Sequence, residues 1–562
     1  MLLSRSRTCL PFVSLLFVSL ICYLTLNLAP RERLSMQRRD LLKAAALLPA
    51  TRNLSAFAEG PAFRQHLWQG YDFGSFFPAR DRLNQGPFDI DQDQGWQTVL
   101  YTTPSEKPLR NPGLGLVGYT WEEGGPSVAA RKHQQSLEDH VEKMASLPFV
   151  DVLYIRCDWR NVQKQAGRLD LDPVWELTLD AAKRHGLRVA FRIQSSNTVF
   201  QPQQLALPEF LRSKIPLVKI GPMGRHGGSE LSAGAAGSWI EPRYDHPEYM
   251  KALTELNHLL AARFDGNPLI EWVDIMHVGF WGEGHFGGYP SSFPDFATAQ
   301  RTLNSMVQLQ LDTWKRTPLA MNTQPDISDT GNREAIEIAV RGGAWVRSDS
   351  IIVEEPVQIE ELANRPPWLA AILEDGYFRS YDVSKLAVDS AGVNELENYM
   401  LHVLDLRANY WSLWTESEHL ASYNERYPRG FERLRQNIGY RLRPSWVWQR
   451  KRVGTSELVV AVSNRGVASV PGVLWLQIAS PDGRFKLKGS LDPGYPLAGG
   501  LRLGSFLLPM GYTGKVNLSA EIELRPGVLK PVAWACEQAV NPDGSISIEV
   551  KPMNDPKWRK SV

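Results

Sequence analysis

The residues best suited to chemistry lie in the stretch 272–285, which reads Trp-Val-Asp-Ile-Met-His-Val-Gly-Phe-Trp-Gly-Glu-Gly-His. Its apolar start is typical of a buried β-strand, and Glu283 follows between two glycines, with Trp281 and His285 close by. A carboxyl group with a tunable pKa, beside an aromatic face on which a sugar can stack, is what glycoside hydrolysis requires. The glycines let a bulky ligand approach the backbone. The stretch therefore predicts a catalytic carboxyl group at Glu283; the alternative is that the two rings pack under a loop and Glu283 is merely exposed.

Short apolar runs alternate with amphipathic helical stretches after residue 112, which favours βα units and a parallel sheet. The expected strands are 116–121, 150–156, 188–194, 271–281, 319–322, 344–349, 377–382 and 410–414. The expected helices are 134–145, 172–185, 247–264, 296–315 and 394–407. This pattern predicts the α/β class and a (β/α)8 TIM barrel over residues 111–440. A long Gly-rich loop before residue 244 interrupts the spacing, and insertions of this kind are usually functional.

Because such a barrel has its active site at the C-terminal ends of its strands, the polar and aromatic residues at those ends are the candidate site residues. The candidate catalytic carboxyl groups are Glu283, Asp382, Asp349 and Glu416. The candidate substrate-binding residues are Trp121, Arg156, Asp158, Gln194, Trp281, His285, Asn322, Arg347, Arg379, Tyr381, Trp411 and Trp414. Any one of them alone is a weak signal, since an Asp after a strand often caps the next helix, as we expect of Asp172.

We expect Glu283 to protonate the glycosidic oxygen and Asp382 to attack or to activate water, with Asp349 and Glu416 as alternatives for the second carboxylate. A separation of about 5 Å between the two carboxyl groups implies retention of configuration, and about 6.5–9.5 Å implies inversion.

The arginine and tryptophan side chains have more than one interpretation. Arg156, Arg347 and Arg379 could hold acidic sugar groups, could orient carboxylates through charge-assisted hydrogen bonds, or could form structural ion pairs. Trp121, Trp281, Trp411 and Trp414 are candidate platforms for sugar rings, whereas Trp272, inside a strand, is expected in the core.

Composition narrows the class of partner. Hydrophobic residues make up 43% of the 562 and charged residues 22%, which is a globular composition. The net charge of +1 gives no support for a nucleic-acid partner. The 18 tryptophans fit a carbohydrate partner, although cores use tryptophan too.

No cofactor or metal is expected. The glycines at 113, 115 and 118 match the dinucleotide fingerprint in spacing, but they begin a strand instead of following one. His277 and His285 do not have the spacing of a compact zinc motif.

The N-terminal residues 1–58 contain two signals typical of export. An apolar run, 10–29, follows Arg5 and Arg7 and is long enough for a signal anchor. A twin-arginine pattern at 38–39 then precedes a second apolar run, so Met36 is a plausible true start. Both interpretations place the folded part in the periplasm or outside the cell, with a membrane contact only if the first run is retained as an anchor.

Segments 59–110 and 441–562 differ from the barrel in composition. The first is rich in Pro, Gly, Asp and Gln and is expected to wrap the barrel as a lead-in segment. The second has alternating apolar runs at 456–463, 473–478, 515–524 and 545–550, separated by turn signals, and predicts an antiparallel C-terminal β-sandwich. Cys157 and Cys536, beyond the leader, are expected to be thiols.

The chain resembles the clan-A barrel glycoside hydrolases with a C-terminal β-sandwich, and more closely a group of secreted bacterial barrel proteins of unknown function. The residues that carry the resemblance are Asn-Pro-Gly at 111–113, Gly-Phe-Trp-Gly-Glu-Gly-His at 279–285 and Arg-Ser-Asp at 347–349. In clan A the general acid/base is a Glu after strand 4, which implies this role for Glu283. The clan's nucleophile is a Glu after strand 7, where the strand expected here ends in Tyr381-Asp382, and residue 282 is Gly where the clan usually has Asn.

Two functions follow as hypotheses. The first is an exported glycoside hydrolase that acts on an oligo- or polysaccharide through paired carboxylates. The alternative is a non-catalytic carbohydrate-binding or cell-envelope protein on a barrel that has lost its nucleophile, which the absence of a Glu at the expected strand 7 favours.

Overall fold

The structure is a computed structural model that describes residues 95–201, 203–222, 238–286, 291–323, 332–349, 351, 356–375 and 395–553. The expected export leader, 1–58, lies outside these residues. Within the described ranges, no helix has both the length and the apolar character needed to cross a bilayer.

Eight parallel strands close into a barrel, which confirms the predicted TIM-barrel fold. In chain order they are β2 (Gly115–Trp121), β3 (Val152–Asp158), β4 (Arg188–Gln194), β7 (Ile270–Asp274), β8 (Leu319–Asn322), β9 (Trp345–Ser348), β10 (Ala371–Glu374) and β11 (Tyr410–Leu413). Strand β11 pairs with β2 and closes the ring. The carboxyl ends of all eight strands therefore meet at one face.

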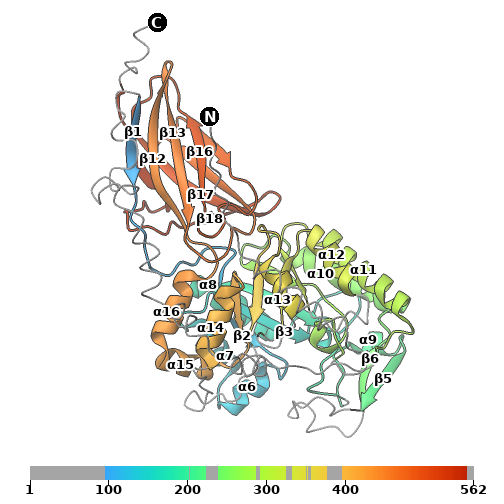
Figure 1. The fold of residues 1–562 in the computed structure, drawn as a ribbon. Coiled ribbons are helices and arrows are strands. Elements are labelled where there is room, and N and C mark those ends of the chain that lie inside the picture. The colour runs from blue at the N-terminus through green and yellow to red at the C-terminus, as the bar shows by residue number, and fades with distance from the viewer. Residues whose placement is uncertain are drawn as a thin grey trace, which may run out of the picture. The chain divides into compact units, whose positions relative to one another are not determined.

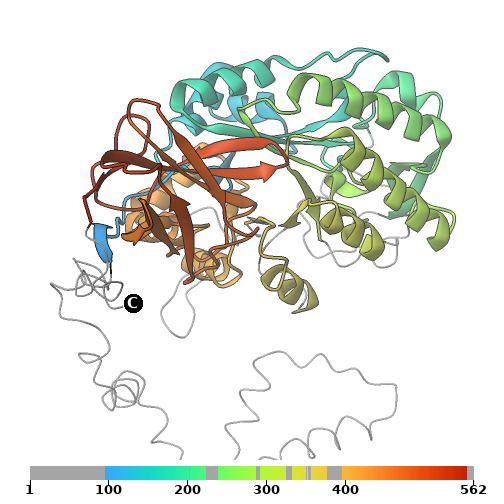
Figure 2. The ribbon, with the colours of Figure 1, turned by 90° about the horizontal axis from the view of Figure 1, so that it is seen from above.

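Helices follow the barrel strands, and capping residues help to explain where the helices begin. They are α6 (Pro126–Lys132), α7 (Leu137–Ala145), α8 (Pro173–His185), α9 (Glu209–Arg212), α10 (Pro247–Phe264), α11 (Phe296–Thr313), α12 (Asn332–Arg341), α13 (Pro356–Ala363), α14 (Glu395–Asp405), α15 (Ser417–Arg426) and α16 (Pro428–Asn437). Asp172 caps α8 as predicted, by accepting a hydrogen bond from the Val174 amide. Helices α10, α11 and α12 lie side by side along one flank of the barrel (Figures 1 and 2).

The prediction of the seventh strand at 377–382 was wrong. The seventh strand is β10, Ala371–Glu374, which pairs with β9 on one side and β11 on the other. Its apolar run is only a few residues long, between Pro366-Pro367 and Asp375-Gly376, and such a short buried strand has no alternation to reveal it. Residues 376–394, and with them Arg379, Tyr381 and Asp382, lie outside the described residues. The correction puts Glu374, and not Asp382, at the end of strand 7.

The long insertion between β4 and α10 contains a two-stranded antiparallel hairpin, β5 (Leu217–Pro222) and β6 (Ser238–Pro242). The end of this hairpin brings Glu241 and Tyr244 back to the barrel, where both are fully buried. The insertion therefore contributes side chains to the neighbourhood of the strand ends.

The C-terminal region consists of antiparallel sheets, as its alternating runs predicted. One contains β1 (Trp96–Tyr101), β12 (Leu442–Arg452), β13 (Thr455–Asn464) and β16 (Leu501–Leu507), and the other contains β14 (Val473–Ala479), β15 (Lys486–Ser490), β17 (Gly514–Arg525), β18 (Val528–Val532) and β19 (Ile546–Val550). Of the lead-in segment, which was expected to wrap the barrel, residues 59–94 lie outside the described residues. Within its described part, β1 forms the edge of the first sheet by pairing with β12.

Buried side chains, many of them aromatic, fill the amino-terminal end of the barrel. The rings of Trp272, Trp345 and Tyr410 pack against one another there, so Trp272 is a core residue as predicted. The same buried cluster continues into side chains of both C-terminal sheets, such as Val460 and Leu476. The opposite, carboxyl end of the barrel carries the polar groups.

Candidate active site

A hydrogen bond between two backbone groups closes the loop that carries Glu283. Strand β7 ends at Asp274, earlier than predicted, and a short turn of 3₁₀ helix, Phe280–Gly282, precedes Glu283. The Phe280 amide donates to the His285 carbonyl at 2.9 Å, and Gly279 has a φ of +76°. A Cβ at Gly279 would lie 2.0 Å from the His285 carbonyl oxygen, so only glycine fits this crossing.

Residues of the inserted segment hold this loop from outside. The Tyr244 hydroxyl accepts from the Gly279 amide at 2.9 Å and donates to Glu241 Oε2 at 2.5 Å. Burial raises the pKa of Glu241 to about 7, against the opposing effect of hydrogen bonds from Ser196 and Tyr244. Trp281, in the left-handed region with a φ of +53°, donates its amide to the Ser196 carbonyl. The strained turn is thus fixed by its surroundings, which is common at functional sites.

Glu283 is buried and fully paired. Its Oε1 accepts from Arg156 Nη1 at 2.7 Å and from Arg192 Nη1 at 2.8 Å, and its Oε2 lies 3.1 Å from His285 Nε2. Burial by itself would raise the pKa of Glu283, but the hydrogen bond from His285 and the charges of Arg156 and Arg192 lower it to about 2. Glu283 is therefore an anion whose orientation is set by strands β3 and β4.

Glu374, at the end of β10, faces the same arginine. Its Oε1 lies 3.4 Å from Arg156 Nη1, and its Oε2 accepts from Arg347 Nη2. Arg347 also donates to the Tyr119 hydroxyl at 3.0 Å. Because Glu283 and Glu374 contact one nitrogen atom, at 2.7 and 3.4 Å, their Oε1 atoms are no more than about 6 Å apart. One carboxylate from the loop after strand 4 and one from the end of strand 7 therefore share the Arg156 guanidinium.

Asp349, just after β9, is a buried carboxyl group of this cluster with a raised pKa. Burial, followed by the negative charge of Glu283 and a hydrogen bond to it, raises the pKa of Asp349 to about 6. The lowered pKa of Glu283 and the raised pKa of Asp349 describe a pair that holds one proton below about pH 6. Neighbouring carboxyl groups with divergent pKa values are the usual arrangement for acid and base roles.

The buried arginines are occupied by protein carboxylates. Arg156 also pairs with Glu123, and Arg192 pairs with Asp274 at 3.2 Å. Among the described residues of the cluster, three guanidinium groups face five carboxyl groups: Glu123, Asp274, Glu283, Asp349 and Glu374. Arg156 and Arg347 therefore contact carboxylates, which fits both the orienting role and the structural ion pair among the predicted interpretations, and the cluster as a whole is not positive.

Other predicted residues present polar atoms at the same end of the barrel. Both side-chain polar atoms of Asn322, the Oε1 atom of Gln194 and the Nε1 atom of Trp281 are buried and have no hydrogen-bond partner among the residues that the structure describes. Gln194 donates through its other amide atom to Asp158 at 2.9 Å. Trp414 donates to Glu123 at 2.8 Å. Buried donors and acceptors without partners are what a ligand rich in hydroxyl groups would satisfy.

Two predicted residues lie apart from this cluster. Glu416 accepts from Lys132 at 2.9 Å and from His133 at 2.7 Å, so its ion pairs join it to α6 and not to Arg156 or Arg347. Trp411 was expected to be a stacking platform, but it is fully buried and stacks on Phe431. Its position on the outward side of β11 makes it a core residue, which alternation along a short strand did not reveal.

Two groups of three side chains in the described part of the chain have ligand atoms within 4.8 Å of one another: His133, Glu416 and Glu418, and Glu283, His285 and Asp349. The second group has the donor types that a divalent cation accepts. However, Arg156 and Arg192 already supply positive charge to Glu283 and would repel a cation bound there. These charges favour proton chemistry over cation binding at this point.

Several residues of the site were missed from the sequence. Glu374 was hidden by the misplaced seventh strand. Arg192 and Asp274 were within segments that were predicted as strands, and a charged side chain in an otherwise apolar strand was the available signal. Glu241, in the Gly-rich insertion, left no such signal.

No family model matches this chain, and no curated protein sequence matches it. Solved structures that align with it include a GH5_18 protein from Bifidobacterium longum subsp. infantis, at 11% identity over 57% of this chain and 78% of that one, with a TM-score of 0.36. Endo-glycoceramidase II from Rhodococcus sp. aligns at 14% identity over 73% and 100%, with a TM-score of 0.33. D-allulose 3-epimerase from Methylomonas sp. aligns at 11% identity over 59% and 100%, with a TM-score of 0.31. Likenesses this weak carry no argument about activity, so the chemistry is argued from the site.

Proposed function

We propose that this protein is an exported glycoside hydrolase that cleaves an oligo- or polysaccharide with retention of configuration. The observation that carries the proposal is the pair Glu283, in the loop after barrel strand 4, and Glu374, at the end of strand 7, with their Oε1 atoms within about 6 Å of each other. Retaining enzymes hold their two carboxyl groups about 5–5.5 Å apart, whereas inverting enzymes need about 6.5–9.5 Å to admit water. Export is proposed from the leader sequence alone.

In the first step, a Glu374 oxygen attacks the anomeric carbon while the glycosidic bond breaks. The proton of the Glu283–Asp349 pair passes through Glu283 to the leaving oxygen. The product is a glycosyl ester on Glu374 and a sugar with a free hydroxyl group.

In the second step, Glu283 takes a proton from water, and the water oxygen attacks the anomeric carbon. The ester bond to Glu374 breaks, which restores both carboxyl groups. Arg156 contacts both carboxylates and Arg347 contacts Glu374, so each is held in place throughout.

The non-catalytic alternative depended on the absence of a Glu at strand 7. Glu374 fills that position, and the alternative loses the feature that favoured it.

The experiment is hydrolysis of aryl glycosides and neutral oligosaccharides by the full chain and by Glu374→Gln, with Glu416→Gln as the matched control. We expect kcat/KM to fall by about a thousandfold or more in Glu374→Gln, because a nucleophile that is lost cannot be replaced by an amide. Glu416→Gln is expected to retain activity within about threefold, because its ion pairs are partly exposed. Activity in Glu374→Gln equal to that of the control would refute the assignment.

A further inference from the structure

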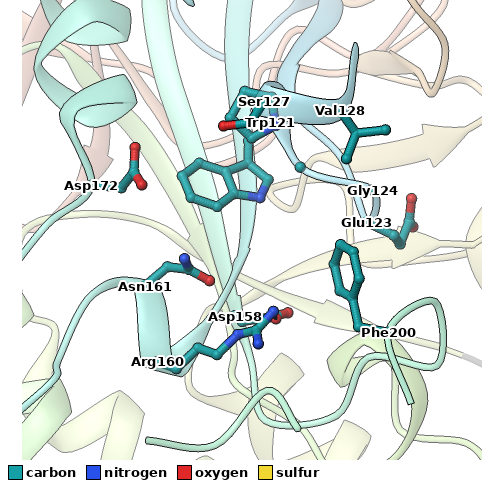
Figure 3. A pocket seen from close by; sticks show the side chains of 12 residues that line it. Trp121, Glu123, Gly124, Ser127, Val128, Asp158, Arg160, Asn161, Asp172 and Phe200 are labelled. Atoms are coloured by element: carbon teal, nitrogen blue, oxygen red, sulfur yellow. Dashed lines mark ion pairs between the residues drawn. The ribbon is translucent and has the colours of Figure 1, made fainter. Parts of the chain in front are cut away.

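A cavity of about 160 Å³ lies at the ends of β2 and β3, and the proposed reaction does not use it (Figure 3). It is bounded by these strand ends, the start of α6 and Phe200 from the loop after β4. Glu283, Asp349 and Glu374 are not among the described residues that line it. A cavity of about 150 Å³ holds one six-membered ring. Its size thus suits a single pyranose ring. Because the proposed catalytic carboxyl groups are not among its described lining residues, this ring is not the one at which the bond breaks.

Two aromatic side chains face this cavity. Trp121, at the end of β2, and Phe200 come from separate elements and lie on different sides of it (Figure 3). The Arg160 guanidinium lies over the Phe200 ring, 5.5 Å from its centre, and pairs with Asp158 at 2.8 Å. Flat apolar faces with polar groups at their edges are the surfaces on which sugar rings pack.

The charged groups that line the cavity argue against an acidic sugar as its ligand. Glu123, Asp158 and Asp172 supply three carboxyl groups, and Arg160 is the cation among the described lining residues. An acidic sugar would bring a further negative charge to these carboxylates and would be repelled. Hydroxyl groups of a neutral sugar can donate to the carboxylates and accept from Arg160.

Arg160 has a donor that the described protein groups do not satisfy. Its Nη1 donates to Gln204 and its Nη2 pairs with Asp158. Its Nε is buried and has no hydrogen-bond partner among the described residues. Buried donors are nearly always paired in proteins. A residue that lines the cavity therefore carries a polar atom that the described residues leave unsatisfied.

The cavity is joined directly to the carboxylate cluster. Asn197 donates both to the Glu123 carbonyl and to Asp158, each at 3.0 Å. The Glu123 carboxylate pairs with Arg156, which contacts Glu283 and Glu374. A ring in the cavity is therefore one residue layer away from the reacting carboxylates.

We propose that this cavity binds one neutral pyranose ring of the substrate, in the subsite next to the ring that reacts with Glu374. This assignment rests on the proposed glycoside hydrolase function, and it names the substrate class as neutral oligosaccharides of two or more rings.

The test compares the full chain with Phe200→Ala and Asn161→Ala, two changes at the cavity wall, and with Trp368→Ala, an aromatic residue that is 46% exposed outside the cavity. The substrates are neutral hexose oligomers of two to six rings and the aryl monoglycoside of the same sugar. We expect the ratio of kcat/KM for the oligomer to that for the monoglycoside to fall about tenfold in both cavity variants and to stay constant in Trp368→Ala. An unchanged ratio in both cavity variants would overturn the assignment.

Calorimetric binding separates this assignment from the proposed function. The same neutral oligomers, and uronic acid oligomers of equal length, are titrated into the full chain and into each variant. If nothing is hydrolysed but neutral oligomers bind and Phe200→Ala weakens them about tenfold, the glycosidase proposal fails and the cavity assignment stands. Absence of binding, equal binding by all variants, or a preference for uronic acid oligomers would refute the cavity assignment.

Discussion

At the scale of single residues, the chemistry depends on how three carboxyl groups are made unequal. Glu283 faces two guanidinium groups and a histidine, Glu374 is held by Arg156 and Arg347, and Asp349 is buried beside an existing negative charge. In the proposed mechanism, carboxyl groups therefore serve as an anion, a nucleophile and a proton store. The environment of each carboxyl group, and not its identity, sets its role.

The Glu283–Asp349 pair predicts the alkaline limb of the pH profile. Because burial and the charge of Glu283 raise the pKa of Asp349 to about 6, the pair carries a proton below this pH and loses it above. We expect kcat/KM for aryl glycosides with poor leaving groups to fall as the pH rises through about 6. In Asp349→Asn the limb near pH 6 should be absent, since the titrating group is gone.

The control for this prediction is a dinitrophenyl glycoside, whose leaving group needs no proton. Its rate should vary much less over the same pH range. An identical limb in Asp349→Asn and in the wild type would show that another group titrates there.

At the scale of elements, the site depends on the turn between β7 and Glu283. Gly279→Ala should reduce kcat/KM by about a hundredfold or more and lower Tm, because the new Cβ would lie 2.0 Å from the His285 carbonyl oxygen at a φ of +76°. Kinetics and thermal unfolding of the purified variant provide the measurement.

Gly483→Ala is the matched control for Gly279→Ala. Gly483 has a φ of +74°, but a Cβ there would have no atom within 4 Å. It therefore carries the same backbone strain without the clash, and we expect full activity with only a small drop in Tm. Equal losses in both variants would mean that the crossing at Gly279 is not what positions Glu283.

The elements also show what the sequence could and could not predict. Strand β4 and helix α10 have the predicted bounds, because β-branched alternation and amphipathic periodicity are strong over their lengths. Strand β10 was missed because a buried strand of a few apolar residues looks the same as a loop segment packed under a helix. Glu283 could be found from its flanking glycines. Its proximity to Glu374 depends on the closure of the barrel, which a local sequence pattern does not predict.

At the scale of the whole molecule, the described residues belong to one compact unit, and a buried ion cluster links the amino-terminal end of the barrel to a C-terminal sheet. Glu271, fully buried in β7, accepts from Arg188 at 3.0 Å, from Tyr410 at 2.6 Å and from Lys530 of β18 at 3.0 Å. Burial would raise the pKa of Glu271, but Arg188 and Lys530 lower it to about 2. This carboxylate stabilises the fold at the end opposite the site.

Glu271→Gln should lower the free energy of unfolding by about 3 kcal/mol or more, since it leaves buried cations without their partner. The lowered pKa also predicts that this stabilisation is present above the ordinary Glu pKa of about 4.3 and is lost as the pH falls toward 2. Urea denaturation of wild type and variant at several pH values measures both effects.

Glu521→Gln is the control for Glu271→Gln, because Glu521 pairs with Lys488 at 2.9 Å on the partly exposed face of a C-terminal sheet. We expect a loss below about 1 kcal/mol for such a pair. Equal losses in the two variants would contradict the structural role given to Glu271.

The most direct test of the central claim is the configuration of the first product, followed by proton NMR during hydrolysis of an aryl glycoside by the full chain. The separation of Glu283 and Glu374 predicts that the anomer formed first has the configuration of the substrate, and that mutarotation then produces the other anomer. If the inverted anomer is formed first, Glu374 is not the nucleophile and the pairing of Glu283 with Glu374 is not the catalytic one.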